Sequence, residues 1–428
     1  MIKLLKKVLS KYPEVEWVIV EDKVSSYELF FVHQKLQMNR AKDVSHYRLS
    51  VFVSEEGFKC RATISIHPTM NEAEVRKAIE DAIYAAQFAK NKTFELASPK
   101  ELAPVENESN MNSKKLKDLA LDIAETVFSV DPGPKCFLNA TEVFVNREQR
   151  NVYNSKGVEY TSSLTKGQVE YITTYQGEDE EYELYRFLEF TNFNPKLIKE
   201  DVERQTEVAR YRAEAKPMRS FKNINVVFNV QEIQDLLDYF MERTNVAMIY
   251  AKESDWQVGT EVQSPGEGDK LSITIDPLQL GSTDTRAFDI DGYTNEKVEI
   301  IKDGKVTALW GPNNFAQYLG YDSKVNNDNI EVKEGTLTPE ELESEPYLEI
   351  VAVSGLQVDE VTGSFGSEIR LALYHENGHI TPYNASAIGG FIKQHSGTWR
   401  FSKEKVQVNN YHGPKYLLLK GVDIFGKE

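Results

Sequence analysis

Apolar positions along the first half of the chain follow helix and strand periods in turn. A helix is predicted at 2–9, where the apolar residues share one face. Thr69 and Glu72 have the spacing of a capping box, which predicts a second helix there, and further helices are predicted from Ser113 and from Asn194-Pro195. Strands are predicted at 15–20, 27–33, 47–53, 58–66, 140–153 and 158–176. The first half is expected to be a helix-rich, mixed α/β region.

The second half has a different pattern. A buried strand at 224–228 is followed by a helix with apolar residues from Ile233 to Met241 on one side. Strands are then predicted at 298–301, 306–310, 347–353, 367–374 and 388–393. The predicted fold class is α+β, with an α/β N-terminal domain at 1–220, a surface loop near 98–112, and a β-rich, largely antiparallel C-terminal domain at 221–428.

Composition and charge narrow the possible functions. The 428 residues include 50 Lys and Arg and 67 Asp and Glu, a formal net charge of 50 − 67 = −17. Such an acidic surface repels a phosphate backbone, so direct nucleic-acid binding is not expected. Cys60 and Cys136 lie far apart, which suits a reducing compartment. Because the N-terminus lacks a signal-peptide pattern and no apolar run approaches the ~18 residues of a membrane span, a cytoplasmic protein without membrane association is predicted.

One stretch of the sequence matches a known catalytic motif. His375-Glu376-Asn377-Gly378-His379 matches H-E-x-x-H, the pattern in which a helix holds zinc with both histidines and the glutamate activates water. Asn-Gly is also the strongest signal for a two-residue β-hairpin turn, and Pro382 would interrupt a helix soon afterwards. In a hairpin the two histidines point to opposite faces and cannot share one ion. The hairpin is predicted, and the zinc helix is kept as the alternative.

Several stretches carry a family resemblance through their order along the chain. They are residues 61–66, 154–158, 226–228 running into Leu236-Leu237, 275–277, 288–293 and 363–365 through 376–378. In this order they resemble the TldD/PmbA family, often labelled modulators of DNA gyrase, over nearly the whole length. The resemblance implies a cytoplasmic, peptidase-associated protein in which a TldD-type and a TldE-type (PmbA-type) subunit form a heterodimer that degrades peptides or unfolded segments.

The resemblance also implies where zinc would be bound. TldD-type subunits carry an H-E-x-x-x-H motif on the helix after the Val-Val-Phe-like strand. In this chain the corresponding helix carries Asp238, Tyr239 and Arg243, and it contains no histidine. A cysteine ligand expected near the C-terminus is also missing. The chain therefore resembles a TldE/PmbA-type subunit with no catalytic or metal-binding residues of its own and no cofactor, and zinc is expected in a TldD-type partner.

Two other functions remain open from the sequence. The first is an autonomous zinc metallopeptidase that uses His375, Glu376 and His379. The second is a non-enzymatic homodimer that binds extended peptides at its sheet edges.

Overall fold

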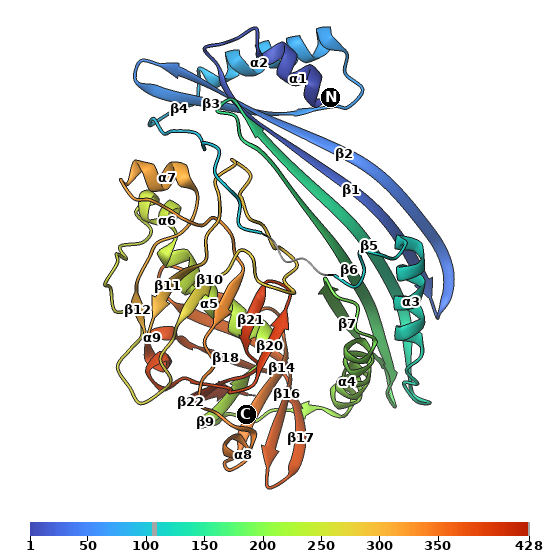
Figure 1. The fold of residues 1–428 in the computed structure, drawn as a ribbon. Coiled ribbons are helices and arrows are strands. Elements are labelled where there is room, and N and C mark those ends of the chain that lie inside the picture. The colour runs from blue at the N-terminus through green and yellow to red at the C-terminus, as the bar shows by residue number, and fades with distance from the viewer. Residues whose placement is uncertain (105–108, 427–428) are drawn as a thin grey trace.

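The computed structural model describes residues 1–104 and 109–426, and within these ranges the named strands form three sheets. The first is an antiparallel sheet of seven strands in the order β4-β3-β2-β1-β5-β6-β7. Its strands are β1 Glu16–Val32, β2 Lys35–Glu55, β3 Phe58–Ile66, β4 Lys90–Asn91, β5 Cys136–Asn154, β6 Glu159–Gln176 and β7 Glu181–Phe190. The long strands β1, β2, β5 and β6 make this sheet extend along the molecule (Figure 1).

Helices pack on one face of the long sheet. They are α1 Ile2–Leu9, α2 Glu72–Ala86, α3 Leu116–Phe128 and α4 Pro195–Glu214. Ile19 of β1 lies in the core formed with α1 and α2, whereas Leu29 of the same strand lies in the core formed with α3 and α4. Residues an even number apart on a strand point to the same face, so the two helix pairs cover opposite ends of one face (Figure 1).

The helices of the first half lie close to their predicted positions, but its strands are longer than predicted. The capping box of α2 lies two residues later than predicted: Asn71 accepts backbone N–H bonds from Ala73 and Glu74, and Glu74 accepts from the Asn71 N–H at 2.8 Å. The predicted strands at 15–20 and 27–33 are one strand, β1. Its polar middle residues have cross-strand partners, as in the 2.6 Å ion pair between Asp22 and Arg150. The expectation of a helix-rich first half is therefore wrong, although the α+β class is confirmed.

The predicted surface loop near 98–112 is only partly described, since residues 105–108 lie outside the described residues. Residues 98–104 and 109–112 contain no helix or strand. Met111 is fully buried in the core beside α3, and the Ser109 hydroxyl is buried against the carbonyl of Thr191. The end of this stretch is thus anchored to the protein rather than lying free on its surface.

The remaining strands form two further sheets. The six-stranded sheet contains β10 Ile273–Ile275, β11 Val298–Lys302, β12 Lys305–Val306, β13 Ile330–Val332, β20 Lys405–Val408 and β21 Tyr411–Pro414. The nine-stranded sheet contains β8 Lys216–Pro217, β9 Phe221–Phe228, β14 Tyr347–Val353, β15 Gln357–Val358, β16 Ser364–Glu376, β17 His379–Asn384, β18 Ser386–Phe391, β19 Arg400–Phe401 and β22 Leu417–Phe425. Because β14 pairs with both β9 and β16, the pairings β14-β9-β22-β18-β16 close into a ring. The predicted boundary between domains 1–220 and 221–428 stays a prediction.

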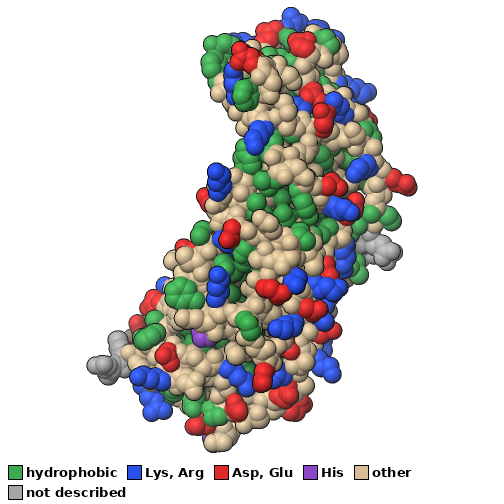
Figure 2. All heavy atoms as spheres, turned by 90° about the vertical axis from the view of Figure 1, so that its left-hand side faces the viewer, with side chains coloured by type: hydrophobic (Ala, Val, Ile, Leu, Met, Phe, Trp, Pro, Cys, Tyr) green, Lys and Arg blue, Asp and Glu red, His purple; other side chains and the backbone are tan. Residues whose placement is uncertain are grey.

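Short helices and the long helix α5 complete this part. They are α5 Val230–Thr244, α6 Val246–Ala251, α7 Asn313–Tyr318, α8 Pro339–Leu342, α9 Ile392–His395 and the 3₁₀ turn η1 Ser396–Thr398. The other face of the long sheet meets this part of the chain, because Val20 and Val152 share a core with Ala287 and Phe288. On the face drawn in Figure 2, hydrophobic side chains gather between the upper end and the larger lower part of the molecule, and charges of both signs are interspersed around them. Within residues 1–104 and 109–426, no helix has the length and apolar character needed to cross a membrane.

Candidate functional site

Helix α5 is the structural counterpart of the helix singled out in the sequence. It follows β9, and its apolar side chains Ile233, Leu236 and Phe240 are fully buried in the main core. At its start, the side-chain amide of Asn229 donates a 2.7 Å hydrogen bond to the Ile350 carbonyl of β14. These contacts fix one side of the helix and determine which side chains remain accessible.

The accessible side of α5 carries three carboxylates at positions i, i+3 and i+7: Asp235, Asp238 and Glu242. Asp238 is exposed, yet desolvation by the surrounding protein, followed by repulsion from Asp235, Glu242, Glu360 and Asp328, raises its pKa to about 6. Desolvation also raises the pKa values of Asp235 and Glu242. The protein around this side of α5 therefore disfavours the ionised form of all three carboxylates.

Loops distant in sequence from α5 carry further carboxylates near this side of the helix. Burial raises the pKa of Asp284 to about 6, and repulsion from Asp328 also raises it. The positive charges of Lys166 and Arg150 on the long sheet lower the pKa of Asp284. Asp284 and Asp328 line a cavity of about 250 Å³ together with Trp310. The Trp310 indole N–H donates to the Met241 carbonyl of α5 at 2.8 Å, which ties the cavity to the helix.

Tyr239 and Arg243 lie on the adjoining side of α5 and have structural partners. The buried Tyr239 ring packs edge-on against Trp256 at 5.5 Å. The Arg243 guanidinium pairs with Asp255, donates to the Glu253 carbonyl at 2.9 Å and lies over the Trp256 ring. Both side chains thus hold the segment after α6 against the helix. Of the three residues predicted at the family's metal position, the structure leaves only Asp238 accessible.

The donor set of α5 does not fit zinc. Catalytic zinc sites use three protein ligands, usually with histidine or cysteine among them, and leave one position open. α5 offers carboxylates alone, and no group of three or more His, Cys, Asp or Glu within residues 1–104 and 109–426 is arranged to hold a metal ion.

The H-E-x-x-H string forms the predicted β-hairpin. Asn377 and Gly378 have φ values of 50° and 75°, as a type I′ turn requires, and they join β16 to β17. His375 pairs with Ile380 and Glu376 with His379, so the histidines point to opposite faces. The His375 ring stacks on Tyr347 with centroids 4.4 Å apart, and its Nε2 lies 3.1 Å from Glu349, whereas His379 is exposed. In this geometry the two histidines cannot bind one ion, which agrees with the predicted hairpin.

Asp328, Glu360 and Asp284 were not predicted as site residues. They come from loops that follow α5 by tens of residues, and no local pattern connects them to the helix. The spacing of Asp235, Asp238 and Glu242 was visible in the sequence and could have identified the acidic side of α5.

Replacing Asp238 with asparagine is expected to stabilise the protein by up to about 1 kcal/mol at pH 8, after allowance for the exposure of the side chain. The raised pKa of Asp238 means that the fold disfavours its ionised form, so the gain is present above about pH 6 and disappears as pH falls toward 4. Urea unfolding at pH 8 and pH 4.5 measures it. Glu203→Gln on the exposed side of α4 is the control and should change nothing. A gain that persists at pH 4.5 would exclude relief of charge as the cause.

Comparisons with known proteins support the family resemblance. Residues 222–426 match the family model for the PmbA/TldA metallopeptidase C-terminal domain. No curated protein sequence matches the chain. Among solved structures, TldE from Thermococcus kodakarensis superposes with a TM-score of 0.82 at 15% identity over 100% of both chains.

Two further solved structures share the fold. A protein described as a modulator of DNA gyrase from Bacteroides thetaiotaomicron has a TM-score of 0.81 at 17% identity, covering 99% of this chain and 98% of its own. A protein with a similar description from Thermotoga maritima has a TM-score of 0.80 at 15% identity, covering 99% of both chains. At these identities the likeness establishes the fold alone, over the whole chain. The match of residues 222–426 identifies this part of the chain as a PmbA/TldA metallopeptidase C-terminal domain, and the fold shared with TldE and the two other solved structures extends over the whole chain.

Proposed function

We propose that this chain is a TldE-type subunit without a metal site, which acts in the cytoplasm with a homologous, zinc-bearing TldD-type subunit to degrade peptides. The observation that carries the proposal is the composition of α5. At the position implied for the family's zinc histidines, this helix presents Asp235, Asp238 and Glu242, and its Tyr239 and Arg243 are committed to structural contacts.

The fold and the accessible side of α5 are consistent with this role. The family model describes a metallopeptidase domain, and the fold matches TldE along the entire chain. Asp238 remains accessible, and Asp328, which lines the cavity with Asp284, is one of the charges that raise its pKa. In the proposed complex, this side of α5 lines the substrate chamber, and the partner supplies the metal that activates water.

Purification of this chain alone, of a TldD-type subunit from the same cell alone, and of the two together tests the proposal. We expect substoichiometric zinc in this chain alone. The two subunits should form a complex whose zinc content equals that of the TldD-type partner. The complex should cleave an unstructured peptide, and a chelator should abolish this cleavage. His379→Ala, at the exposed hairpin tip, serves as a control and should leave cleavage by the complex unchanged.

Two results would overturn the proposal in favour of the other functions. Stoichiometric zinc in this chain alone that is lost in His379→Ala would establish an autonomous zinc peptidase. A homodimer that binds peptides, but neither joins the TldD-type subunit nor increases its cleavage, would establish a binding module.

A further inference from the structure

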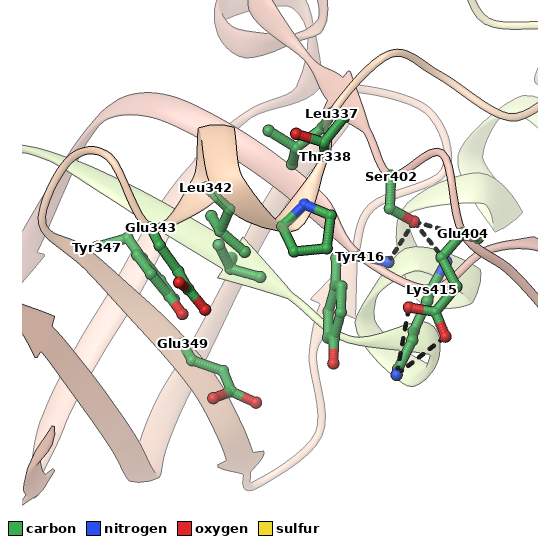
Figure 3. A pocket seen from close by; sticks show the side chains of 12 residues that line it. Leu337, Thr338, Leu342, Glu343, Tyr347, Glu349, Ser402, Glu404, Lys415 and Tyr416 are labelled. Carbon is green, nitrogen blue, oxygen red and sulfur yellow. Dashed lines mark hydrogen bonds and ion pairs between the residues drawn. The ribbon is translucent and has the colours of Figure 1, made fainter. Parts of the chain in front are cut away.

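A pocket of about 270 Å³ lies on the far side of the nine-stranded sheet from α5. Val227 of β9 faces this pocket, whereas its neighbours Val226 and Phe228 face the core that contains α5. Leu337 and Leu342 belong to its apolar wall, and α8 lies across it (Figure 3). The volume suits a ligand about the size of one amino acid.

The polar wall of the pocket contains a tyrosine hydroxyl without a protein partner. Tyr347 as a residue is 8% exposed, but within the described part of the chain its hydroxyl oxygen is not among the buried unpaired atoms, so the hydroxyl is open to the pocket. The ring is held by the parallel stack on His375, at an interplanar angle of 7°. Figure 3 shows the hydroxyl end of Tyr347 beside Glu343 at the polar side of the pocket. A rigid hydroxyl that lines a cavity and has no protein partner can form hydrogen bonds with a ligand.

Glu343 and Glu349 line the same pocket as this hydroxyl. Burial, then Glu349, Glu343 and Tyr416, raise the pKa of Tyr347 to about 12, so the hydroxyl keeps its proton at neutral pH. Glu343 has no ion pair among the described residues. Glu349 binds His375 at one oxygen and Arg204 at the other, at 3.4 Å, and each oxygen retains a second acceptor site.

The positive charge in the pocket wall is already neutralised. Lys415 forms a 3.2 Å ion pair with Glu404 at the edge of the pocket (Figure 3). Glu343 and the Tyr347 hydroxyl are therefore left to accept N–H donors from a ligand, next to an apolar wall that suits methylene groups.

We propose that this pocket binds an organic cation of about amino-acid size, an ammonium or guanidinium group on an aliphatic chain. The cation donates hydrogen bonds to Glu343 and to the Tyr347 hydroxyl, and its methylenes lie against Leu337 and Leu342. His375 acts as a positioning residue, since it stacks on Tyr347 and binds Glu349. This site uses the first histidine of the H-E-x-x-H string without any metal, and it is independent of the proposed peptidase role.

Calorimetric titration of the full chain at constant ionic strength tests the proposal. The probes are butylammonium, butylguanidinium, the peptide N-acetyl-Gly-Arg-Gly-amide and the neutral isostere 1-pentanol. We expect the cations to bind and pentanol not to bind. Glu343→Gln should weaken cation binding about tenfold or more, and Tyr347→Phe, which keeps the ring and its stack, about threefold to tenfold.

Glu345→Gln is the matched control, because it removes the same charge two residues away, outside the pocket, where Glu345 bonds Asn225. It should change binding less than twofold. Equal affinity for free cations and peptide would assign the site to small cations, whereas a peptide advantage of tenfold or more would assign it to basic side chains. Equal loss in Glu343→Gln and Glu345→Gln, or binding of pentanol equal to that of the cations, would overturn the proposal.

Discussion

Replacing Phe240 with alanine is expected to lower the free energy of unfolding by about 4 kcal/mol. The Phe240 side chain is fully buried on α5, with its ring 5.2 Å from Tyr239, 6.1 Å from Trp256 and 5.9 Å from Trp399. Alanine would leave a cavity in the middle of this aromatic group, and the close packing of the surrounding core restricts relaxation. Urea unfolding at pH 7, monitored by tryptophan fluorescence, measures the loss.

The expected loss depends on which side of α5 is changed. Phe240→Leu keeps most of the volume and should cost about 1.5 kcal/mol or less. Asp238→Ala, two residues earlier on the accessible side, should cause no loss at pH 7, because the fold already disfavours its charge. Equal destabilisation by Phe240→Ala and Asp238→Ala would contradict the division of α5 into a packing side and an accessible side.

This division explains how much of the candidate site the sequence could predict. The apolar period from Ile233 to Phe240 identifies α5 and its buried side, because helical periodicity is a local property. The two turn residues of the hairpin, Asn377 and Gly378, are predicted correctly for the same reason, because the turn depends on the residue types at two adjacent positions. Local signals of this kind also identify α2, α3 and α4.

Features that depend on distant residues could not be predicted in this way. Strand β7 is not predicted although its polar and apolar residues alternate, which is a local strand signal, and the structure pairs it with β6 at the edge of the long sheet. The closure of β14 onto β16 also requires strands from separate segments to meet. Asp328 and Glu360 reach Asp238 only through this arrangement, and Tyr347 reaches His375 only through the register of β14 with β16. Neither the group of carboxylates around Asp238 nor the proposed cation pocket has a local pattern in the sequence.

The stability of the protein is expected to depend on pH through the buried carboxyl of Asp289. Burial, then repulsion from Asp291, raises the pKa of Asp289 from 3.8 to about 7. Between these values the folded state holds a proton that the unfolded state releases, so this carboxyl makes the protein less stable as pH rises from about 4 to 7. Asp289→Asn removes this dependence and should stabilise the protein at pH 8 by up to about 4 kcal/mol.

The hydrogen bonds of Asp289 allow the charge to be tested separately from the turn. Oδ1 accepts the backbone N–H groups of Asp291 and Tyr293 at 3.0 and 2.9 Å, and an asparagine carbonyl can keep both bonds. Oδ2 accepts from the Asn326 amide at 3.3 Å, and a rotation of that amide restores this contact in the variant. Asp289→Ala loses all three bonds and should destabilise the protein by about 2–3 kcal/mol even at pH 5.

Unfolding free energies of the wild type, Asp289→Asn and Asp289→Ala at pH 5, 6.5 and 8 measure both effects. Taking each variant relative to the wild type removes the contributions of other groups that titrate in this range, such as His395 and Glu232. Asp303→Asn, in an exposed hairpin turn, should give the same small difference at every pH. If the advantage of Asp289→Asn does not grow between pH 5 and pH 8, then Asp289 is ionised in the fold without penalty, and its hydrogen bonds compensate its burial.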